Sequence, residues 1–356
     1  MSLQALEQVS LPVDFSAFSE IVDVRSPGEF AEDHLPGAIN LPALDDAQRC
    51  EVGTLYKASP FDARRLGAAM ISGNIARYLE NELRNRTKDW APLVYCWRGG
   101  MRSGSVAVVL RSIGWRARIL DGGYKAWRGY VREDLSRLVG SPELRLHILA
   151  GLTGSAKTRL LHAIEAAGTQ VLDLEGLANH RGSLLGTVGP QPGQKRFETL
   201  LHERLSALDL TKPVFAEAES NRIGTVHIPG ALWKRLGRGR VFEILLPREE
   251  RAAYLLEDYQ HFPDDPQRFH TLVNGLRRLR GNELVDQWQQ LITDGQWTDF
   301  VRSILQNHYD LVYRRPGSTD CVYRKPERQI ELPDAQAASI AEAARELIAA
   351  SKSVPE

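Results

Sequence analysis

Residues 92–115 read PLVYCWRGGMRSGSVAVVLRSIGW, and they predict a strand, a glycine-rich loop and a helix in direct succession. The apolar run PLVYCW (92–97) is typical of a buried strand, whereas SVAVVLRSIGW (105–115) has apolar residues at helical spacing. Three further strands are predicted on either side: EIVDVRS (20–26), AINLP (38–42) and ARILDGG (117–123). Strands that alternate with helices and glycine-rich stops predict a parallel α/β sheet.

A second α/β pattern begins after SRLVGSPE (136–143), whose Gly and Pro are typical of a junction. LRLHILAG (144–151) predicts a strand, and TRLLHAIEAAG (158–168) predicts the helix that follows it. The remaining elements of this half are strands at QVLDLEG (170–176), KPVFAEAES (212–220) and VFEILLP (241–247), and an Ala-rich helix over 334–351. The chain of 356 residues suits two domains. We therefore predict one α/β domain over residues 1–137 and a second over residues 138–356.

The composition limits the classes of function. Lys plus Arg equals Asp plus Glu at 45 each, which argues against a protein that coats nucleic acid by bulk charge. The N-terminal MSLQALEQVSLPVDF lacks the pattern of a signal peptide, and no apolar run has the length of a membrane span. The cysteines Cys50, Cys96 and Cys321 have neither zinc-ligand spacing nor a disulfide framework. We expect a cytoplasmic protein without membrane contact.

Cys96 is the candidate nucleophile, because it ends a strand and enters a loop suited to an anion. A reactive thiolate needs nearby positive charge or backbone N–H groups to lower its pKa. The loop that supplies them consists of Trp97, Arg98, Gly99, Gly100, Arg102 and Ser103. Its glycines permit the backbone to curl so that N–H groups point inward. The alternative is a buried strand-end cysteine beside a solvated turn.

The first half resembles the rhodanese family over about residues 14–137. DVRSPGEFAEDHLPGAINLP (23–42) is similar to the first signature of that family, and DGGYKAW (121–127) is similar to its closing motif. The resemblance implies a rhodanese-like fold with a persulfide or perselenide on Cys96. It also implies that Asp23 and Arg25 form a structural pair.

The loop departs from common rhodanese sulfurtransferases in its length. Five residues separate Cys96 from Arg102, whereas those enzymes have four. The longer loop resembles that of the related cell-cycle phosphatases, which cradles a phosphate. We therefore expect a phosphate-sized anion in the loop.

GLTGSAKT (151–158) resembles the Walker A pattern of phosphate-binding P-loops. Its phosphate-binding candidates are Gly151, Gly154, Ser155, Lys157 and Thr158. Ala156 replaces the second glycine of the pattern, and it fits there if its φ is negative. Backbone N–H groups would surround a phosphate chain, and Lys157 would contact its oxygens. The alternative is an ordinary turn with a surface lysine.

Acidic side chains lie near the ends of the predicted strands in this half. Asp173, Glu175, Glu217 and Glu219 are candidates for Mg²⁺ or phosphate contacts, and Arg181 is a further candidate phosphate ligand. Helix capping or solvated carboxylates would also explain the acids, and a turn would explain Arg181. No tightly bound cofactor is predicted, and the identity of any metal stays open.

Between Asn221 and Phe242 the chain has no Asp or Glu. The cations of this stretch are Arg222, Lys234, Arg235, Arg238 and Arg240, with Trp233 among them. Cations interleaved with aromatics suit RNA backbone contact and base stacking. Ordinary solvated side chains are the alternative.

With GTLYK (53–57) and LEGLANHRGS (174–183), the whole chain resembles the bacterial tRNA 2-selenouridine synthases. The resemblance implies S-geranylation of 2-thiouridine at wobble position 34 of tRNAs for Lys, Glu and Gln, with geranyl diphosphate as co-substrate. It then implies replacement of the geranylthio group by selenium from selenophosphate, through an S-selanyl form of Cys96. A selenophosphate-supplying enzyme would be a partner.

The residues themselves leave two alternative functions open. One is a rhodanese-type sulfurtransferase coupled to an ATP-dependent P-loop domain. The other is a non-catalytic RNA-binding module.

Overall fold

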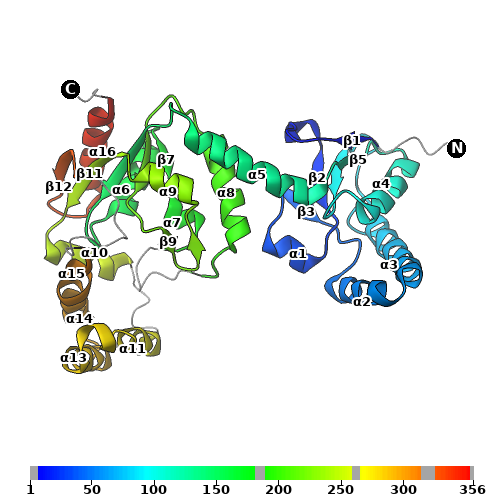
Figure 1. Cartoon of the computed structure of the whole chain (residues 1–356). Coiled ribbons are helices and arrows are strands. Elements are labelled where there is room, and N and C mark those ends of the chain that lie inside the picture. Colours follow the sequence, from blue (N-terminus) through cyan, green and yellow to red (C-terminus); the bar gives the residue numbers. More distant parts are fainter. Residues whose placement is uncertain (1–6, 181–188, 259–264, 314–324, 353–356) are drawn as a thin grey trace. The chain divides into compact units, whose positions relative to one another are not determined.

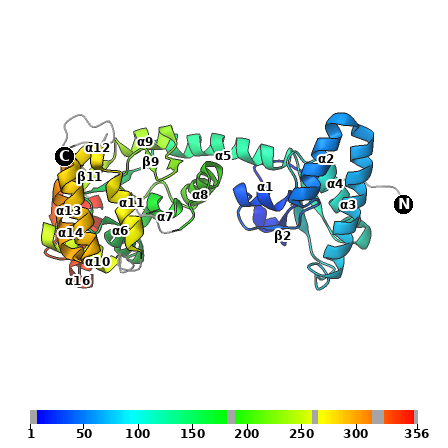
Figure 2. The same cartoon turned by 90° about the horizontal axis from the view of Figure 1, so that it is seen from below.

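The computed structural model describes residues 7–180, 189–258, 265–313 and 325–352, and the chain forms two compact units (Figures 1 and 2). Unit 1 comprises Met1–Ser136 together with Pro192–Glu203, and unit 2 comprises Arg137–Gln191 together with Arg204–Glu356. The first boundary lies one residue from the predicted one. The prediction of an uninterrupted second domain is wrong for residues 192–203, which pack with unit 1.

Unit 1 contains a five-stranded sheet in the order β1-β5-β4-β2-β3, and every pairing in it is parallel. The strands are β1 (Gln8–Val9), β2 (Glu20–Asp23), β3 (Ala38–Asn40), β4 (Pro92–Tyr95) and β5 (Arg118–Leu120). All four residues of the central strand β4 are buried, as expected for a parallel strand covered on both faces. The predicted parallel α/β sheet is confirmed.

The helical elements of unit 1 before residue 137 are η1 (Phe15–Ala17), α1 (Pro27–Glu32), α2 (Asp46–Ala58), α3 (Pro60–Glu80), α4 (Met101–Ile113) and α5 (Gly123–Gly140), whose last turn belongs to unit 2. Helix α4 ends at Gly114, which has a φ of 111° that favours glycine. Helices α2 and α3 pack side by side as a hairpin, with Ser59 ending the first and capping the second (Figures 1 and 2).

Helix α8 (Gln194–Ser206) is joined to unit 1 by polar contacts to buried groups. The Asp33 carboxylate is fully buried and accepts hydrogen bonds from Tyr124 Oη at 2.8 Å and Thr199 Oγ1 at 3.0 Å. His202 contacts Asp134 at 3.0 Å between Nε2 and Oδ2. These partners lie far apart in the sequence, which is why the sequence pattern did not assign this helix to unit 1.

Unit 2 contains a second five-stranded sheet, in the order β12-β11-β6-β8-β7, and its pairings are also all parallel. The strands are β6 (Leu146–Ala150), β7 (Gln170–Leu172), β8 (Val214–Glu217), β11 (Arg240–Leu245) and β12 (Arg328–Glu331). Strands β9 (Arg222–Ile223) and β10 (Val226–His227) form a separate antiparallel pair. The predicted α/β class is therefore confirmed for this half too.

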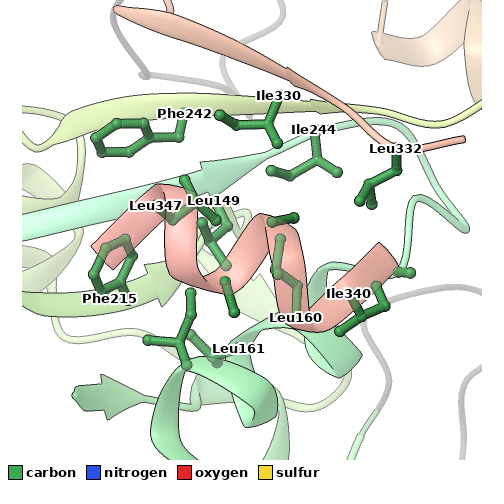
Figure 3. Packing of buried hydrophobic residues seen from close by; sticks show 14 of the residues in the cluster. Leu149, Leu160, Leu161, Phe215, Phe242, Ile244, Ile330, Leu332, Ile340 and Leu347 are labelled. Carbon is green, nitrogen blue, oxygen red and sulfur yellow. The ribbon is translucent and has the colours of Figure 1, made fainter. Parts of the chain in front are cut away.

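Apolar helix faces pack on this second sheet. Figure 3 shows Ile340 and Leu347 of α16 (Ala337–Lys352) against Leu149, Phe215 and other residues of the sheet, with Leu160 and Leu161 of α6 (Lys157–Ala166) in the same cluster. Burial of this apolar surface stabilises the sheet and the helices packed on it. Helix α6 begins where the glycine-rich loop after β6 ends, so this packing also positions that loop.

The other helical segments of unit 2 are α7 (Leu174–Leu177), α9 (Gly230–Leu236), α10 (Arg248–Asp258), α11 (Pro266–Asn274), α12 (Arg277–Arg280), α13 (Asn282–Thr293), α14 (Trp297–Ile304), the π-helical η3 (Leu305–Tyr309) and α15 (Asp310–Tyr313). Helices α10, α11, α13 and α14 enclose their own apolar core around Trp288 and Phe300. Among the helices of the described part of the chain, none has the length and apolar character needed to cross a bilayer.

Candidate functional site

Cys96 follows directly after β4, and its side chain is buried with 4 % exposure. Its Sγ lies 3.2 Å from Oγ of Ser103 on the first turn of α4. Burial raises the pKa of the Cys96 thiol, but hydrogen bonds with Ser103 and the Arg98 backbone N–H, together with the charge of Arg102, outweigh burial and lower it. The structure therefore places the predicted nucleophile among groups that stabilise a thiolate.

The loop around Cys96 is held by the glycine pair of the DGGYKAW segment. Gly123 has a φ of 56°, and a Cβ there would lie 2.3 Å from the Cys96 carbonyl oxygen. The Tyr124 N–H donates to that same oxygen at 2.8 Å. Gly99 has a φ of 67°, and a Cβ on it would lie 2.9 Å from the Leu120 carbonyl oxygen. Close backbone approach at these two glycines gives the loop its curl.

The two arginines of the loop occupy different environments. Arg98 is exposed, whereas Arg102 pairs with Glu29 at 2.6 Å between Nη1 and Oε2. Glu29 also accepts from the Ser26 backbone in the capping box of α1. Sequence reasoning missed Glu29, although it belongs to the first rhodanese-like segment. It holds the Arg102 guanidinium in place beside the thiol.

The expected structural pair of Asp23 and Arg25 is confirmed. Arg25 Nη2 lies 2.6 Å from Asp23 Oδ2, and the two side chains are only 1 % and 0 % exposed. Arg25 also donates to the Asp33 carbonyl and stacks 3.8 Å over the ring of Tyr124. These buried contacts join β2 to the start of α5 and leave the pair no access to a substrate.

The glycine-rich loop of unit 2 connects β6 to α6, as the sequence predicts. Lys157 begins α6, and its Nζ donates to the Gly151 carbonyl at 3.0 Å. Gly151 and Gly154 have φ values of 152° and 80°, in the region that favours glycine. Arg251 of α10 donates to the Thr153 carbonyl at 3.0 Å and supports the loop from outside. The sequence did not indicate Arg251, because this residue belongs to no recognised motif.

Ala156 does not have the negative φ under which an alanine was expected to fit this position. Ala156 has a φ of 58° and is 2 % exposed, so an alanine occupies the left-handed conformation. That conformation costs an L-residue about 1–2 kcal/mol. Its methyl group belongs to the apolar core of the unit, which compensates for part of this cost. The loop therefore keeps its conformation without the second glycine of the pattern.

Three glutamates converge beside this loop. One ligand oxygen from each of Glu175, Glu217 and Glu219 lies within 4.8 Å of the others. They converge because β8 pairs with β6, which places Glu217 opposite Leu149 just before the loop. Both oxygens of Glu217, which is 1 % exposed, have no hydrogen-bond partner within the described part of the chain. These carboxylates lie much closer together than their separation in the sequence indicates.

Burial and mutual repulsion raise the pKa of each glutamate in this cluster. Burial, with the Glu175 charge, raises the pKa of Glu217 to about 8, while Lys157 lowers it. The pKa values of Glu175 and Glu219 are raised as well, because both are buried next to other carboxylates. Carboxylates that crowd together and repel one another suit a divalent cation, so the residues present fit a Mg²⁺ ion.

Asp173 and Ser155 differ in their surroundings. Asp173 caps α7 by accepting from the Gly176 N–H at 2.7 Å, and it also contacts His162. Asp173 therefore acts as a helix cap, which was the predicted alternative to a Mg²⁺ or phosphate contact. Ser155 Oγ is buried and has no partner among the described residues. Arg181 lies outside the described residues.

The chain resembles known proteins in both halves. Residues 7–130 match the family model of the rhodanese-like domain, and residues 144–271 match that of the tRNA 2-selenouridine synthase AAA domain. A tRNA 2-selenouridine synthase of Shewanella piezotolerans is 30 % identical over 329 residues, which cover 83 % of this chain and 87 % of the relative. The chain belongs to the tRNA 2-selenouridine synthase family.

Other members of the tRNA 2-selenouridine synthase family align over a smaller share of their length. The relative from Nitrosomonas europaea is 37 % identical over 258 residues, which are 69 % of this chain and 64 % of the relative. The relative from Bdellovibrio bacteriovorus is 34 % identical over 274 residues, which are 73 % of this chain and 69 % of the relative. The chain thus spans just under two thirds of the length of the Nitrosomonas relative.

In this member of the tRNA 2-selenouridine synthase family, the five predicted RNA-contacting cations fall into two groups. Arg222, Lys234 and Arg238 are exposed. Arg235 instead donates to the carbonyls of Ser141 and Leu144, and Arg240 forms an ion pair with Glu327. The structure therefore leaves three of these cations accessible and ties two into the fold.

Proposed function

We propose that this protein converts 2-thiouridine at wobble position 34 of tRNA to 2-selenouridine, by S-geranylation followed by selenation. The observation that carries the proposal is the pairing, in one chain of this family, of a thiolate-stabilising loop at Cys96 with a phosphate loop at Lys157. Relatives named tRNA 2-selenouridine synthase support the overall reaction.

The phosphate loop serves the geranylation step in this proposal. The sulfur of 2-thiouridine attacks the first carbon of the geranyl chain, the carbon–oxygen bond breaks, and diphosphate leaves. Lys157, Thr158 and the loop N–H groups hold the diphosphate, since a helix N-terminus preceded by glycines favours anions. In this proposal the Lys157 ammonium, which donates to the Gly151 carbonyl, exchanges that carbonyl for a phosphate oxygen when the diphosphate binds. Glu217 and its neighbours would hold a Mg²⁺ ion, which neutralises charge on the leaving diphosphate when bound.

The Cys96 loop serves the selenation step. The Cys96 thiolate attacks the selenium of selenophosphate and forms the S–Se bond of an S-selanyl cysteine, while the Se–P bond breaks and phosphite leaves with the bonding pair. Arg98 and the loop N–H groups hold the phosphorus oxyanion. The terminal selenium then attacks carbon 2 of the uridine and displaces geranylthiolate. External thiols then reduce the S–Se bond, which releases 2-selenouridine and regenerates the Cys96 thiol. Because the Cys96 thiol is buried, it suits a donor as small as selenophosphate. The five-residue spacing from Cys96 to Arg102 gives the loop room for a phosphate.

The tRNA partner follows from the same proposal. Arg222, Lys234 and Arg238 are the exposed cations that would contact the RNA backbone. The substrates would be the tRNAs for Lys, Glu and Gln, and a selenophosphate-supplying enzyme would feed the second step. The reaction belongs to the cytoplasm.

The test is mass spectrometry of 2-thiouridine-containing tRNA after incubation with geranyl diphosphate, with and without selenophosphate. The wild type should give the S-geranyl nucleoside without selenophosphate and 2-selenouridine with it. Cys96→Ser should keep geranylation and lose selenation, while Lys157→Ala should lose geranylation. Full selenation by Cys96→Ser, or normal geranylation by Lys157→Ala, would remove the assigned role of that residue.

A second candidate is a sulfurtransferase coupled to an ATP-dependent domain. The buried carboxylate of Glu217, on the strand next to the phosphate loop, favours it, because P-loop nucleotidases hold Mg²⁺ with an acid at a comparable place. Hydrolysis of ATP stimulated by a sulfur donor would support this candidate over geranylation.

A further inference from the structure

A cavity of about 860 Å³ opens beside the phosphate loop of unit 2. It extends from Val241, near the start of β11, to the carboxyl ends of β6, β11 and β12, where Gly151 and Ser155 of the phosphate loop form part of its wall. Parallel sheets bind ligands at the carboxyl ends of their strands, so this is the expected edge for a site. The cavity and the phosphate loop are therefore parts of one continuous surface.

The wall of the cavity beyond the phosphate loop is mainly apolar. Its apolar members include Val241, Leu245, Leu246, Pro247, Leu332 and Pro333. Figure 3 shows Leu332 and the neighbouring Ile244, which also lines the cavity, at one end of the sheet core. The two strand-end alanines, Ala150 and Ala218, add little side-chain volume and keep the space open.

Two charged side chains at the border of the cavity are already engaged. Arg251 forms a bidentate pair with Asp310 at 2.9 and 2.8 Å, and Glu243 accepts from Gln329 at 2.7 Å. Glu331 is exposed at the rim. This lining favours a hydrocarbon over the base and ribose of a nucleotide, which need several hydrogen-bond partners.

We propose that this cavity binds the apolar chain of a prenyl diphosphate whose diphosphate group lies on the phosphate loop. This inference rests on the proposed geranylation, and it assigns the isoprenoid chain to Leu245 and its neighbours. The volume lies within the range of about 300–1,000 Å³ that small-molecule pockets span. Each buried CH₂ group contributes about a fourfold gain in affinity, so chain length governs binding.

The experiment is titration calorimetry of the full chain without tRNA, so that no turnover occurs. The probes are geranyl diphosphate, the five-carbon dimethylallyl diphosphate, inorganic diphosphate and ATP. Geranyl diphosphate should bind at least about tenfold more tightly than dimethylallyl diphosphate, and inorganic diphosphate should bind more weakly than either. Equal affinity for geranyl diphosphate and inorganic diphosphate would overturn the proposal.

Leu245→Trp fills the cavity and should weaken geranyl diphosphate binding at least about tenfold while leaving inorganic diphosphate binding unchanged. Leu245→Ala, which removes contacts without adding bulk, should weaken geranyl diphosphate several-fold. Leu279→Trp is the matched control, because Leu279 is 67 % exposed and does not line the cavity. Thermal unfolding of each variant verifies that it is folded.

The outcomes separate this proposal from the proposed function. Equal weakening of geranyl diphosphate and inorganic diphosphate by a folded Leu245→Trp would overturn the cavity assignment. Tight ATP binding that Leu245→Trp abolishes would overturn it in favour of a nucleotide. Unchanged inorganic diphosphate binding in Lys157→Ala would instead refute the phosphate loop as the diphosphate site.

Discussion

At the scale of single residues, the reactivity of Cys96 depends on a few neighbours within one turn of chain. Burial by itself would make the thiol inert, because a low-dielectric environment disfavours the thiolate. Ser103, on the first turn of α4, opposes that effect through its hydroxyl and its backbone N–H. The hydroxyl is the part of this environment that a substitution can remove without disturbing the backbone.

Ser103→Ala should raise the pKa of the Cys96 thiol and reduce its reactivity near neutral pH. In the wild type the pKa is lowered, so the thiolate persists to lower pH, and alkylation should begin at lower pH than for an ordinary cysteine. Peptide-level mass spectrometry of iodoacetamide labelling across pH measures the midpoint for Cys96 alone. Ser112→Ala, on the exposed side of the same helix, should leave the midpoint in place. An unshifted midpoint in Ser103→Ala would contradict the assigned role of the hydroxyl.

Gly123→Ala should destabilise unit 1 by about 2–4 kcal/mol. The added Cβ would meet the Cys96 carbonyl oxygen at 2.3 Å, and the backbone has a φ of 56°. Gly129→Ala is the matched control: it lies within the same helix, and its Cβ would meet nothing within 4 Å. The control should be neutral or stabilising by up to about 1 kcal/mol, because alanine favours helix. Denaturant unfolding of both variants measures the difference, and equal stabilities would contradict the packing described.

At the scale of elements, the glutamate cluster results from strand order. Glu217 ends β8, and β8 pairs with β6, the strand that leads into the phosphate loop. Glu175 comes from the short helix α7, which follows β7 on the other side of β8. Repulsion among these buried carboxylates is relieved either by protonation or by a cation.

Millimolar Mg²⁺ should therefore raise the unfolding temperature of the wild type, since a ligand that binds only the folded state stabilises it. Glu217→Gln should lose most of this increase because it removes a buried ligand charge. Glu342→Gln, an exposed position on α16, is the control and should respond to Mg²⁺ as the wild type does. Differential scanning fluorimetry with and without Mg²⁺ makes the comparison. An equal Mg²⁺ response in Glu217→Gln would exclude Glu217 as a ligand.

At the scale of the whole chain, each unit is assembled from segments that are distant in sequence. Residues 192–203 complete unit 1 although they follow 55 residues of unit 2, Arg137–Gln191. The hydrogen bond from Thr199 to the fully buried Asp33 spans 166 positions. Such a contact forms only after the intervening chain has folded back.

Thr199→Val should lower the free energy of unfolding by about 1–3 kcal/mol, because Asp33 loses a donor while the side-chain shape is kept. Thr271→Val is the control, since Thr271 is exposed on α11 and, within the described residues, its hydroxyl donates only to the Gln267 carbonyl of the same helix. Urea unfolding followed by the fluorescence of the tryptophans measures both variants. A loss no larger than that of the control would show that the Thr199–Asp33 hydrogen bond does not stabilise unit 1.

The sequence by itself determined the two α/β halves, the Cys96 loop, the glycine-rich loop between β6 and α6, and the Asp23–Arg25 pair. Each of these depends on residues close together in the chain, whose spacing is read directly from periodicity and motif. Only the tertiary structure decided that α8 joins unit 1, that Glu29 holds Arg102, and that Glu175 and Glu217 meet. It also decided that Ala156 adopts a left-handed conformation and that an apolar cavity adjoins the phosphate loop. These features arise from pairing between strands that are not consecutive and from packing across long separations, which local patterns do not encode.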